Sequence, residues 1–449
     1  MQSDLRGYIA QIARSNDLAV VKKKVSTKYE IAAITANLDG LKAVLFENIQ
    51  ESKFRVVANL VGTRKRFAQA VRAKESQIHE KVIWAIKHVS KPKAISKGKF
   101  MENRTRDISI LPIVRHFTKE PGRFVTSSIV YTKNQEVGTQ NSSFHRLLPL
   151  DKKHFSIRMV EGRHLDKCFM YAKEHGEDLK VAITVGVHPA VSIAGAYQAD
   201  WGKDELEIAN ALLDSKLTLT KCPYSGMSIP SDAEIVMEGR ILKDKTHKEW
   251  MVEMLRTYDF KRRQPVFELD TLYFRNNPIF HDILSGYAEH RLLMGMPIEA
   301  KLIRNVRQLL PQTRQVALTE GGCNWLHAVI QISKKNQADP KKAIDAAFAA
   351  HRSLKTAIVV DDDIDPHDPV AVEYAIATRF QADKDLIIMP KLRGSSLDPS
   401  SDQKNLLTTK MGIDATKSFL KNREGFEIAK IPKQDKVSLK DYGITLNVK

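Results

Sequence analysis

The sequence predicts a protein of mixed α+β and α/β class, organised in three consecutive regions. Residues 1–97 alternate short helical patterns with short apolar runs. Residues 98–300 contain many β-branched runs separated by Gly, Pro, Asn and Asp, and residues 301–449 return to alternating strands and helices. A chain of 449 residues is long enough for this organisation, because single domains usually hold about 100–200 residues. We therefore place the domain boundaries at these positions.

The N-terminal region has the pattern of a small α/β unit. Apolar residues recur at helical spacing in three segments, and two short apolar runs have the length of buried strands. The predicted helices cover residues 4–15, 66–73 and 78–89, and the predicted strands cover residues 42–49 and 54–62.

The central region is predicted to be an antiparallel barrel or sandwich. Its apolar runs are short, rich in β-branched residues and separated by turn residues, which is typical of such folds. One helix, over residues 202–214, interrupts the series. The predicted strands cover residues 123–132, 154–160, 180–187, 216–222, 233–242 and 265–274.

The C-terminal region is predicted to contain a parallel βαβ unit. An Ala-rich helix over residues 340–354 precedes an apolar strand over residues 355–363. A helix over residues 368–380 and a second strand over residues 384–390 follow. A helix between two strands of one sheet usually makes those strands parallel.

Composition and motifs exclude several classes of protein. The chain has three widely spaced cysteines and 43% hydrophobic residues, so it is neither a disulfide scaffold nor a disordered chain. It contains no GxGxxG, GxxxxGK[ST], GxSxG or HExxH motif, which argues against a dinucleotide fold, a P-loop ATPase, a serine hydrolase of that type and a zincin. No apolar run is long enough to cross a membrane, and we expect a cytoplasmic protein.

The formal charge of +18 has two interpretations. A basic surface attracts nucleic acid, and it also attracts anionic metabolites towards a site. The lysines are spread along the whole chain, and no nucleic-acid recognition module accompanies them. We therefore favour an enzyme with an anionic substrate and keep a basic nucleic-acid-binding protein as the alternative class.

The richest group of polar residues lies within residues 140–167. Amide, imidazole and guanidinium groups together are suited to holding a phosphate and a divalent metal, although six such residues are also common on a surface sheet. These residues are Asn141, His145, Arg146, Arg158, Arg163 and His164.

Two glutamates farther along the chain could complete a metal site. Glu234 and Glu238 are four residues apart and would share one face of a strand. One of them could join Asn141 and His164, and oxygen and nitrogen ligands of this kind favour Mg²⁺ or Mn²⁺ over zinc. Either glutamate could instead pair with a neighbouring Lys or Arg.

Three further polar groups each have two interpretations. Glu289 precedes an apolar segment, so its carboxyl is either a proton donor with a raised pKa or part of a helix cap. Lys410 precedes a glycine and is either a phosphate ligand or a surface lysine. Asp361 to Asp363 end a predicted strand, and we favour a structural role for them over ligand binding.

Taken in order, these segments resemble the UbiD-type decarboxylases, which use prenylated FMN. The resemblance runs from about residue 100 to 420 and lies in the ordered set, not in any one motif. It implies a central split β-barrel that binds the flavin, and a homo-oligomer assembled through the C-terminal α/β domain. The matching segments are GRFVTSSIVYTKN, QNSSFHR, VAITVGVHPAVSIAGA, SIPSDAEIVMEG, EGGCNWLHAVIQI, VVDDDIDPHD and TKMGIDAT.

The resemblance also implies roles for single residues. Asn141, His164 and Glu238 would bind Mn²⁺ or Mg²⁺, and K⁺ is a further implied ion. Arg146 would orient the substrate carboxylate, and Glu289 would deliver a proton. The residues along the flavin would be Phe144, His145, Arg146, Arg158, Met159, Val160, Arg163, His164 and Lys410.

A flavin cofactor agrees with the chemistry of decarboxylation. Loss of CO₂ from an sp² carbon leaves an electron pair that protein side chains do not accept, so a cofactor has to supply the electron sink. A flavin prenyltransferase is therefore implied as the partner that supplies the modified flavin.

The implied substrate is a small phosphorylated unsaturated acid. Many family members have GPxGDxTGYY before the PVF strand, whereas this chain has EWMVEMLRTYDFKRRQPVF at 249–267, where only Glu253 and Tyr258 could replace its polar positions. The segment GYAEHRLLMGMP at 286–297 resembles the archaeal branch, which converts trans-anhydromevalonate 5-phosphate to isopentenyl phosphate in the mevalonate pathway of isoprenoid biosynthesis. A 4-hydroxy-3-polyprenylbenzoate or another aromatic acid is the alternative substrate. Candidates for binding a substrate phosphate are Lys261, Arg262 and Arg263.

Overall fold

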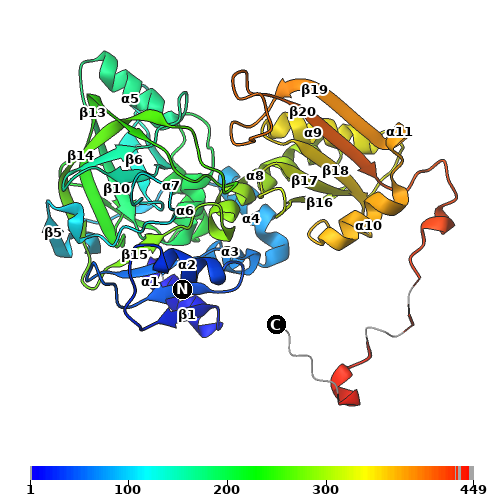
Figure 1. Ribbon diagram of the computed structural model, residues 1–449, viewed down its shortest axis with the longest axis horizontal. Helices are drawn as coiled ribbons and strands as arrows, with labels where there is room; N and C mark the ends of the chain where they lie inside the picture. Colours follow the sequence, from blue (N-terminus) through cyan, green and yellow to red (C-terminus); the bar gives the residue numbers. More distant parts are fainter. Residues whose placement is uncertain (1–2, 430, 433–435, 444–449) are drawn as a thin grey trace.

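The structure is a computed structural model that describes residues 3–429, 431–432 and 436–443, and it confirms the predicted mixed class (Figure 1). Two lobes lie side by side. One lobe contains the N-terminal and central regions, and the other contains the C-terminal sheet. The helix α8 (Ala288–Leu309) lies between the lobes and runs across the boundary expected at residue 300. Part of the expected C-terminal domain, residues 430, 433–435 and 444–449, is outside the described residues.

The N-terminal sheet is completed by a strand from the central region. Its order is β1-β2-β3-β15, and β15 (Ile279–Asp282) pairs in parallel with β3. The first helix begins where predicted because the Asp4 side chain accepts a hydrogen bond from the backbone N–H of Gly7, at 2.9 Å. The N-terminal elements are α1 (Leu5–Arg14), β1 (Leu18–Val21), α2 (Glu30–Asn37), β2 (Ala43–Phe46), β3 (Arg55–Ala58), α3 (Arg64–Ala70) and α4 (Ile78–Lys87).

The central sheet is antiparallel and has the order β7-β6-β10-β13-β14-β9-β8, with β5 paired to β14. The strand predicted over residues 123–132 is shorter than expected, because only isolated bridges form at Phe124 and Val125 before β6 begins. The strands are β5 (Asn103–Thr105), β6 (Ile129–Lys133), β7 (Gln140–Phe144), β8 (Leu147–Pro149), β9 (His154–Ile157), β10 (Leu179–Val185), β13 (Ile235–Glu249) and β14 (Arg262–Phe274).

The two edges of this sheet meet at one place. The edge strands β7 and β8 are consecutive in the chain, and only His145 and Arg146 separate them. Two linking residues hold the Cα atoms of the flanking strand ends within about 11 Å, since neighbouring Cα atoms are about 3.8 Å apart. The sheet therefore curls into a barrel that is split at a seam, and His145 and Arg146 lie in that seam.

Helices and a small sheet complete the central region. The side chain of Asp204 accepts a hydrogen bond from the backbone N–H of Leu206 at 2.9 Å, which starts α7 at Glu205. A three-stranded sheet has the order β12-β11-β4. These elements are β4 (Lys93–Ala94), α5 (His164–Glu174), α6 (Pro189–Ala196), α7 (Glu205–Leu212), β11 (Thr218–Lys221) and β12 (Ser228–Pro230).

The C-terminal sheet has the order β16-β17-β18-β20-β19. A parallel βαβ unit is present, but it is formed by β17, α9 and β18. The unit predicted over residues 355–390 is wrong, because β20 inserts beside β18 and β19 pairs with β20 in antiparallel orientation at the sheet edge. The elements are β16 (Thr313–Leu318), β17 (His327–Ile332), α9 (Asp339–Ala350), β18 (Thr356–Asp361), α10 (Pro369–Arg379), α11 (Ala382–Asp385), β19 (Leu386–Arg393) and β20 (Leu407–Ala415).

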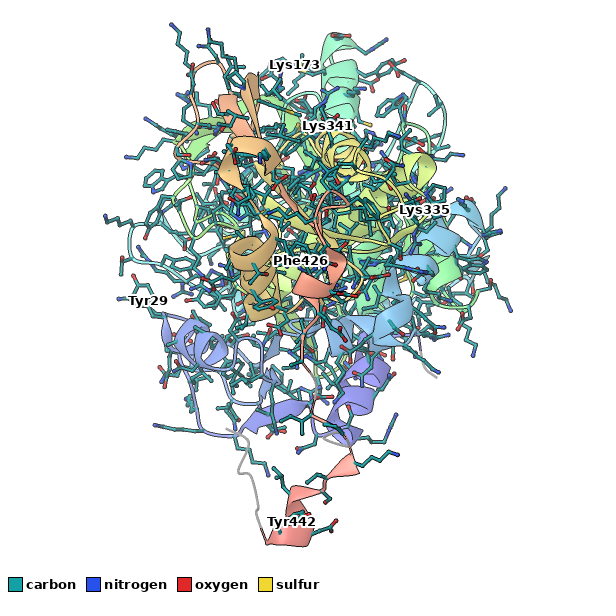
Figure 2. The ribbon with its side chains drawn as sticks, turned by 90° about the vertical axis from the view of Figure 1, so that its right-hand side faces the viewer. Tyr29, Lys173, Lys335, Lys341, Phe426 and Tyr442 are labelled. Carbon is teal, nitrogen blue, oxygen red and sulfur yellow. The ribbon has the colours of Figure 1, made fainter. Side chains whose placement is uncertain are left out.

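The surface carries its positive charge on several sides. Figure 2 shows side chains tipped with nitrogen around the whole outline of the molecule, with Lys173, Lys335 and Lys341 labelled at separate places. This distribution agrees with lysines spread along the sequence. Within the described residues, no helix combines the length and the apolar character needed to cross a membrane.

Candidate active site

Three polar side chains meet where β7, α5 and α7 approach one another. The Nδ2 atom of Asn141 lies 3.4 Å from Nδ1 of His164 and 3.1 Å from Oε1 of Glu205. His164 and Glu205 are the first residues of their helices, so both helices present their N-terminal residue to β7. The structure thus brings Asn141 and His164 together, as expected, and adds Glu205 as their third neighbour.

The carboxylate of Glu205 is buried in this site. It accepts hydrogen bonds from the Asn141 amide and from the backbone N–H of Ser142, the latter at 2.7 Å. Burial raises the pKa of Glu205 to about 8. A carboxylate whose ionised form is disfavoured in this way gains stability when a cation binds to it.

The three side chains fit a hard divalent cation. An amide oxygen, an imidazole nitrogen and a carboxylate oxygen are ligands that favour Mg²⁺ or Mn²⁺. The Nδ2 atom of Asn141 now faces Glu205, and turning the amide by a half rotation would present its oxygen in the same place. Among the described residues, no group of three His, Cys, Asp or Glu side chains could hold a metal, so the fit described here depends on the Asn141 amide together with His164 and Glu205.

The prediction that Glu238 completes this site is wrong. Glu238 of β13 is paired with Ala182 of β10. Ala182 is paired with Tyr131 of β6, which is paired with Ser142 of β7. Paired residues share a face of the sheet and consecutive residues alternate, so Glu238 and Asn141 lie on opposite faces. Three strand spacings, about 14 Å in total, also separate their strands.

Both glutamates of the segment 230–240 have structural partners. The carboxylate of Glu238 accepts hydrogen bonds from the backbone N–H groups of Tyr224 and Ser225, at 3.1 and 2.7 Å. Glu234 forms salt bridges with Arg6 at 2.8 Å and Arg275 at 3.0 Å. The alternative interpretation, in which a glutamate pairs with a basic neighbour, therefore holds for Glu234.

Arg146 lies in the seam of the barrel and is surrounded by carboxylates from the end of β13 and from the loop between β13 and β14. Its guanidinium donates to both oxygens of Glu249, at 3.1 and 2.9 Å, and also contacts Glu253. A third carboxylate, Asp259, lies 3.4 Å away and pairs with Arg262 at 3.1 Å. Burial acts to lower the pKa of Arg146, but Glu253 and Glu249 raise it above its ordinary value. The guanidinium therefore stays charged in a buried position.

The three carboxylates around Arg146 differ in exposure. The side chain of Glu253 is 21% exposed, whereas those of Glu249 and Asp259 are 1% and 7% exposed. A ligand carboxylate entering the site can therefore compete with Glu253 most easily. Because a guanidinium binds a carboxylate through two parallel hydrogen bonds, Arg146 is suited to orienting an acid substrate.

Hydrogen bonds link several of the residues expected along the flavin. The imidazole of His145 lies 2.8 Å from the Ser143 hydroxyl and 2.7 Å from the Arg158 carbonyl oxygen. Burial lowers the pKa of His145 to about 4, so this imidazole is neutral near pH 7. The backbone N–H of Met159 donates to the Gln264 side chain at 2.7 Å. Phe144 is partly buried on β7, and the exposed members of the set are Val160 and Arg163.

Glu289 is held by groups other than Arg146. Its Oε1 atom lies 3.1 Å from Nε2 of His281 and accepts a hydrogen bond from the backbone N–H of Val61 at 3.3 Å. The carboxylate is buried at the start of α8. The structure therefore pairs Glu289 with His281, and does not show the contact with Arg146 that a shared catalytic site would suggest.

Lys410 is buried on β20 in the C-terminal lobe. Its ammonium donates to the Arg352 carbonyl oxygen at 2.8 Å and lies 5.1 Å from the ring centroid of Phe348. Burial lowers the pKa of Lys410 to about 8. It is thus no ordinary surface lysine, and its contact with a cofactor stays a prediction.

The aspartates that end β18 form an ion network. Arg379 pairs with Asp361 at 2.8 Å and with Asp363 at 2.9 Å, and Lys417 pairs with Asp363 at 2.7 Å. Asp362 accepts a hydrogen bond from the Ser333 hydroxyl. These contacts join β18 to α10 and to the segment after β20, in agreement with the structural role expected for the three aspartates.

Three family models match consecutive parts of the chain. They describe the N-terminal, Rift-related and C-terminal domains of 3-octaprenyl-4-hydroxybenzoate carboxy-lyase, and match residues 9–86, 87–288 and 291–415. The anhydromevalonate phosphate decarboxylase of Methanocaldococcus jannaschii is 41% identical over 417 residues, which cover 92% of this chain and 97% of the relative. The chain belongs to the UbiD family. The resemblance found in the sequence is confirmed, and with it the class of carboxy-lyase.

Other UbiD-family proteins extend the comparison. The anhydromevalonate phosphate decarboxylase of Aeropyrum pernix is 39% identical over 92% of this chain and 93% of the relative. The UbiD-class enzyme HmfF from Pelotomaculum thermopropionicum, solved in complex with FMN, is 37% identical with a TM-score of 0.95 over 98% of this chain and 100% of that chain. An evolved dimeric form of HmfF, solved with prFMN, has a TM-score of 0.91 at 35% identity, over 98% of this chain and 100% of that chain. These UbiD-class structures confirm the predicted fold class.

Glu205 and two of the carboxylates at Arg146 were not recognised as site residues from the sequence of this UbiD-family chain. A signal for Glu205 was present, because it precedes Ala209 by four residues and Leu212 by seven and so lies on the apolar face of its helix. A carboxylate on such a face needs a polar or cationic partner. Glu249 and Asp259 gave no comparable signal, because their contact with Arg146 depends on where the end of β13 and the loop after it lie in the folded chain.

Proposed function

We propose that this UbiD-family chain decarboxylates trans-anhydromevalonate 5-phosphate to isopentenyl phosphate, with prenylated FMN and Mn²⁺ or Mg²⁺ as cofactors. Four relatives named anhydromevalonate phosphate decarboxylase support this substrate, since they are 36–41% identical over 92–96% of this chain. Two HmfF structures with FMN and prFMN support the flavin.

The observation that carries the proposal is the position of two polar sites at the two ends of one strand. Asn141, with His164 and Glu205, lies near the start of β7, and Arg146 lies just after its end. At about 3.3 Å per residue, five residues of strand span about 17 Å. A flavin mononucleotide can bridge such a distance from its phosphate to its ring.

The residues near the start of β7 would hold the cation and, through it, the flavin phosphate. Glu205 would bind in its ionised form, since a cation offsets the effect of burial on that carboxylate. Bound prenylated FMN would supply the sink for the electron pair that CO₂ leaves behind on the carbon atom. A role for K⁺ stays a prediction.

Arg146 would orient the substrate carboxylate. When that carboxylate binds one edge of the Arg146 guanidinium group, its negative charge lies close to the carboxyl group of Glu253. Because a like charge raises the pKa of a carboxyl group, the pKa of Glu253 then rises. Glu253 then takes up a proton from solvent. The bond between the alkene carbon and the carboxyl group breaks, CO₂ leaves, and the proton of Glu253 replaces it on that carbon.

We propose Glu253 as the proton donor in place of Glu289. Glu253 contacts Arg146 and is partly exposed, whereas the contacts of Glu289 are with His281 and Val61. The role of Glu289 in catalysis stays a prediction, which the paired variants described in the Discussion test.

The experiment that tests the function is a direct assay of the loaded enzyme. The protein is produced together with a flavin prenyltransferase, and the bound flavin is identified by its absorption spectrum and mass. The two candidate acids, trans-anhydromevalonate 5-phosphate and a 4-hydroxy-3-polyprenylbenzoate, are then assayed side by side. We expect release of CO₂ and formation of isopentenyl phosphate from the first acid only; turnover of the aromatic acid alone, or of neither acid by loaded enzyme, would contradict the proposal.

Assembly and location follow from the same proposal. We expect a homo-oligomer assembled through the C-terminal domain and a cytoplasmic enzyme, with no role in nucleic-acid binding. Light scattering during size-exclusion chromatography measures the assembly, and a salt titration with RNA and DNA tests the alternative class.

A further inference from the structure

We propose that three residues outside the network of Arg146 are positioning residues for the carboxyl group of Glu253. They hold a short hairpin, residues 251–259, which carries Glu253 and is called the Glu253 hairpin from here on. The proposal deepens the function proposed above and rests on it for the role of Glu253 as proton donor. The three positioning residues are Glu120, Met254 and Arg256.

The Glu253 hairpin is a tight turn between β13 and β14. The backbone N–H of Glu253 donates to the Thr257 carbonyl oxygen at 2.9 Å, and Val252 and Tyr258 form an isolated antiparallel bridge. Successive side chains of an extended segment point to opposite sides. Val252 and Met254 are accordingly buried, whereas the side chain of Glu253 is 21% exposed. The neighbours of Glu253 are therefore the places where the hairpin is held.

Glu120 holds the start of this hairpin. Its buried carboxylate accepts hydrogen bonds from the backbone N–H groups of Val252 and Phe117, both at 3.2 Å. The same segment is bound a second time, because the Trp250 indole N–H donates to the Lys119 carbonyl oxygen at 2.6 Å. A buried N–H group that loses its acceptor is left unsatisfied, so the contact with Glu120 fixes the backbone at Val252.

Met254 anchors the hairpin on the other side of Glu253. Its side chain is buried in an apolar cluster that also contains Leu302 of α8 and Val316 of β16, and Leu255 packs against the same cluster. The helix α8 lies between the two lobes (Figure 1). The hairpin therefore reaches from the central sheet into the core of the C-terminal lobe, and the place of Glu253 depends on both.

Arg256 fastens the hairpin to the turn before α8. Its Nε atom donates to the Gly286 carbonyl oxygen at 3.0 Å, and its guanidinium lies 4.1 Å from the ring centroid of Tyr287. A Cβ atom at Gly286 would lie 2.6 Å from Cγ of Arg256 and 3.0 Å from the Glu253 carbonyl oxygen. Glycine is therefore required for this close approach, and the backbone of Glu253 lies directly against the turn.

These anchors fix the backbone of Glu253 and leave its side chain able to turn. Glu253 contacts Arg146, and its carboxyl group has to turn towards the alkene carbon after the substrate carboxylate binds Arg146. A side chain reaches one place reproducibly only when the backbone that carries it is fixed. Misplacement of a reacting group by about 1 Å can lower a rate about 10²-fold. The three positioning residues therefore act on the step in which Glu253 delivers its proton.

The first measurement tests whether the anchors hold the hairpin and needs no flavin. Hydrogen exchange of the full-length protein is followed by mass spectrometry on a peptide that covers residues 250–260. Glu120→Ala and Arg256→Ala should each speed the exchange of the protected amides about tenfold, as expected for the loss of a hydrogen bond. Glu120→Gln and Arg256→Lys keep one acceptor or one donor and should give intermediate rates. The control Glu174→Ala, at the exposed end of α5, should exchange as the wild type does.

The second measurement distinguishes positioning of Glu253 from a general loss of structure. In enzyme loaded with prenylated FMN, Glu120→Ala should lower kcat about 10-fold to 100-fold and leave KM nearly unchanged, because Arg146 still binds the substrate carboxylate. In the Glu253→Gln background the same change should have little further effect, since Glu120 acts through Glu253. A residue that only supports the fold would lower kcat by the same factor in both backgrounds. Arg256→Ala and Met254→Ala should follow Glu120→Ala, and Met254→Leu should retain kcat.

The proposal is overturned if hairpin exchange is unchanged in the alanine variants, or if the hairpin exchanges faster and kcat stays at the wild-type value. It is also overturned if Glu120→Ala lowers kcat equally in both backgrounds. A loaded wild type that turns over neither acid would contradict the proposed function instead, and the exchange measurement would still decide whether the anchors hold the hairpin. The two failures are therefore distinguishable.

Discussion

Two arginine-rich places in this molecule differ in their balance of charge. In the network around Arg146, three arginines face three carboxylates, namely Arg146, Arg158 and Arg262 with Glu249, Glu253 and Asp259. Around Lys301 the charges are mostly positive, with Arg163, Arg304 and Arg352 on one side of the balance and Asp200 on the other. The charges at the first place balance one another without a ligand, so the guanidinium of Arg146 is held in position before a substrate binds. The mostly positive residues at the second place would be stabilised by a bound anion, so they are suited to binding an anionic ligand.

The largest expected effect comes from removing Arg146. Arg146→Ala leaves the buried carboxylate of Glu249 without its counter-ion, which costs about 3–5 kcal/mol in the free energy of unfolding, and it removes the group that orients the substrate. Arg146→Lys keeps the charge but loses the paired hydrogen bonds, so it should be more stable than the alanine variant and still nearly inactive. Denaturant unfolding and turnover are measured on both. An active Arg146→Ala enzyme would show that the network has no catalytic role.

The next effect separates the two candidate proton donors. Glu253→Gln should lower kcat about 10²–10⁴-fold while the protein still takes up the cofactor, because a general acid typically contributes that much. Glu289→Gln changes a carboxylate that contacts His281, and we expect a much smaller loss of kcat. The reverse ranking, with loaded cofactor in both variants, would return the role to Glu289.

A pair of buried glutamates tests the metal site. Glu205→Gln should weaken Mn²⁺ binding by about 10-fold to 100-fold or more, since it removes a charged ligand. Glu238→Gln should leave the metal affinity unchanged and instead cost about 1–3 kcal/mol of stability, because its carboxylate accepts backbone hydrogen bonds. Isothermal titration with Mn²⁺ and denaturant unfolding give both quantities. Loss of the metal in the Glu238 variant alone would contradict the register argument.

The pH dependence of the stability of the metal-free protein is a second test of Glu205 as the buried carboxylate of the metal site. The pKa of Glu205 rises from its ordinary value of 4.5 to about 8 on folding, so between these values the folded protein binds more protons than the unfolded chain. The contribution of Glu205 to the free energy of unfolding therefore falls as pH rises from about 4.5 to about 8. Mn²⁺ binds the ionised carboxylate and should remove this fall, and Glu205→Gln should lack it. A pH profile that is the same in the wild type and in Glu205→Gln would speak against a raised pKa.

The smallest effect concerns capture of the substrate. Exposed cations at the lobe junction attract a phosphorylated acid, and salt screens this attraction. KM should therefore rise with ionic strength by a few fold, with kcat nearly constant. In Lys301→Ala the rise should be smaller, whereas Lys173→Ala should retain it. An identical salt dependence in wild type and both variants would show that Lys301 and its basic neighbours do not attract the substrate.

The sequence allowed much of the fold to be predicted, because most elements show their own periodicity. Helices such as α1 and α9 and strands such as β10 and β14 lie where their apolar patterns indicate. The pairing at the C-terminal edge could not be predicted in this way. The position of β19 depends on β20, which comes later in the chain and inserts beside β18.

The site was predictable where its residues are close in sequence. Asn141 and His164 were recognised because both lie in one polar segment. Glu234 and Glu238 were both candidates from the sequence, and the family resemblance selected Glu238, but pairing across three strands puts it on the other face of the sheet. Glu205 was not recognised, because the apolar pattern of its helix indicates only a packing role. Its contact with Asn141 depends on the approach of α7 to β7.

The most direct test of the account is the location of a bound metal. Crystals of the protein grown with Mn²⁺ and FMN would give an anomalous difference map at the manganese absorption edge. We predict one peak in contact with Asn141, His164 and Glu205, next to the flavin phosphate. A peak at Glu238, or a flavin phosphate bound with no metal between it and Glu205, would contradict it.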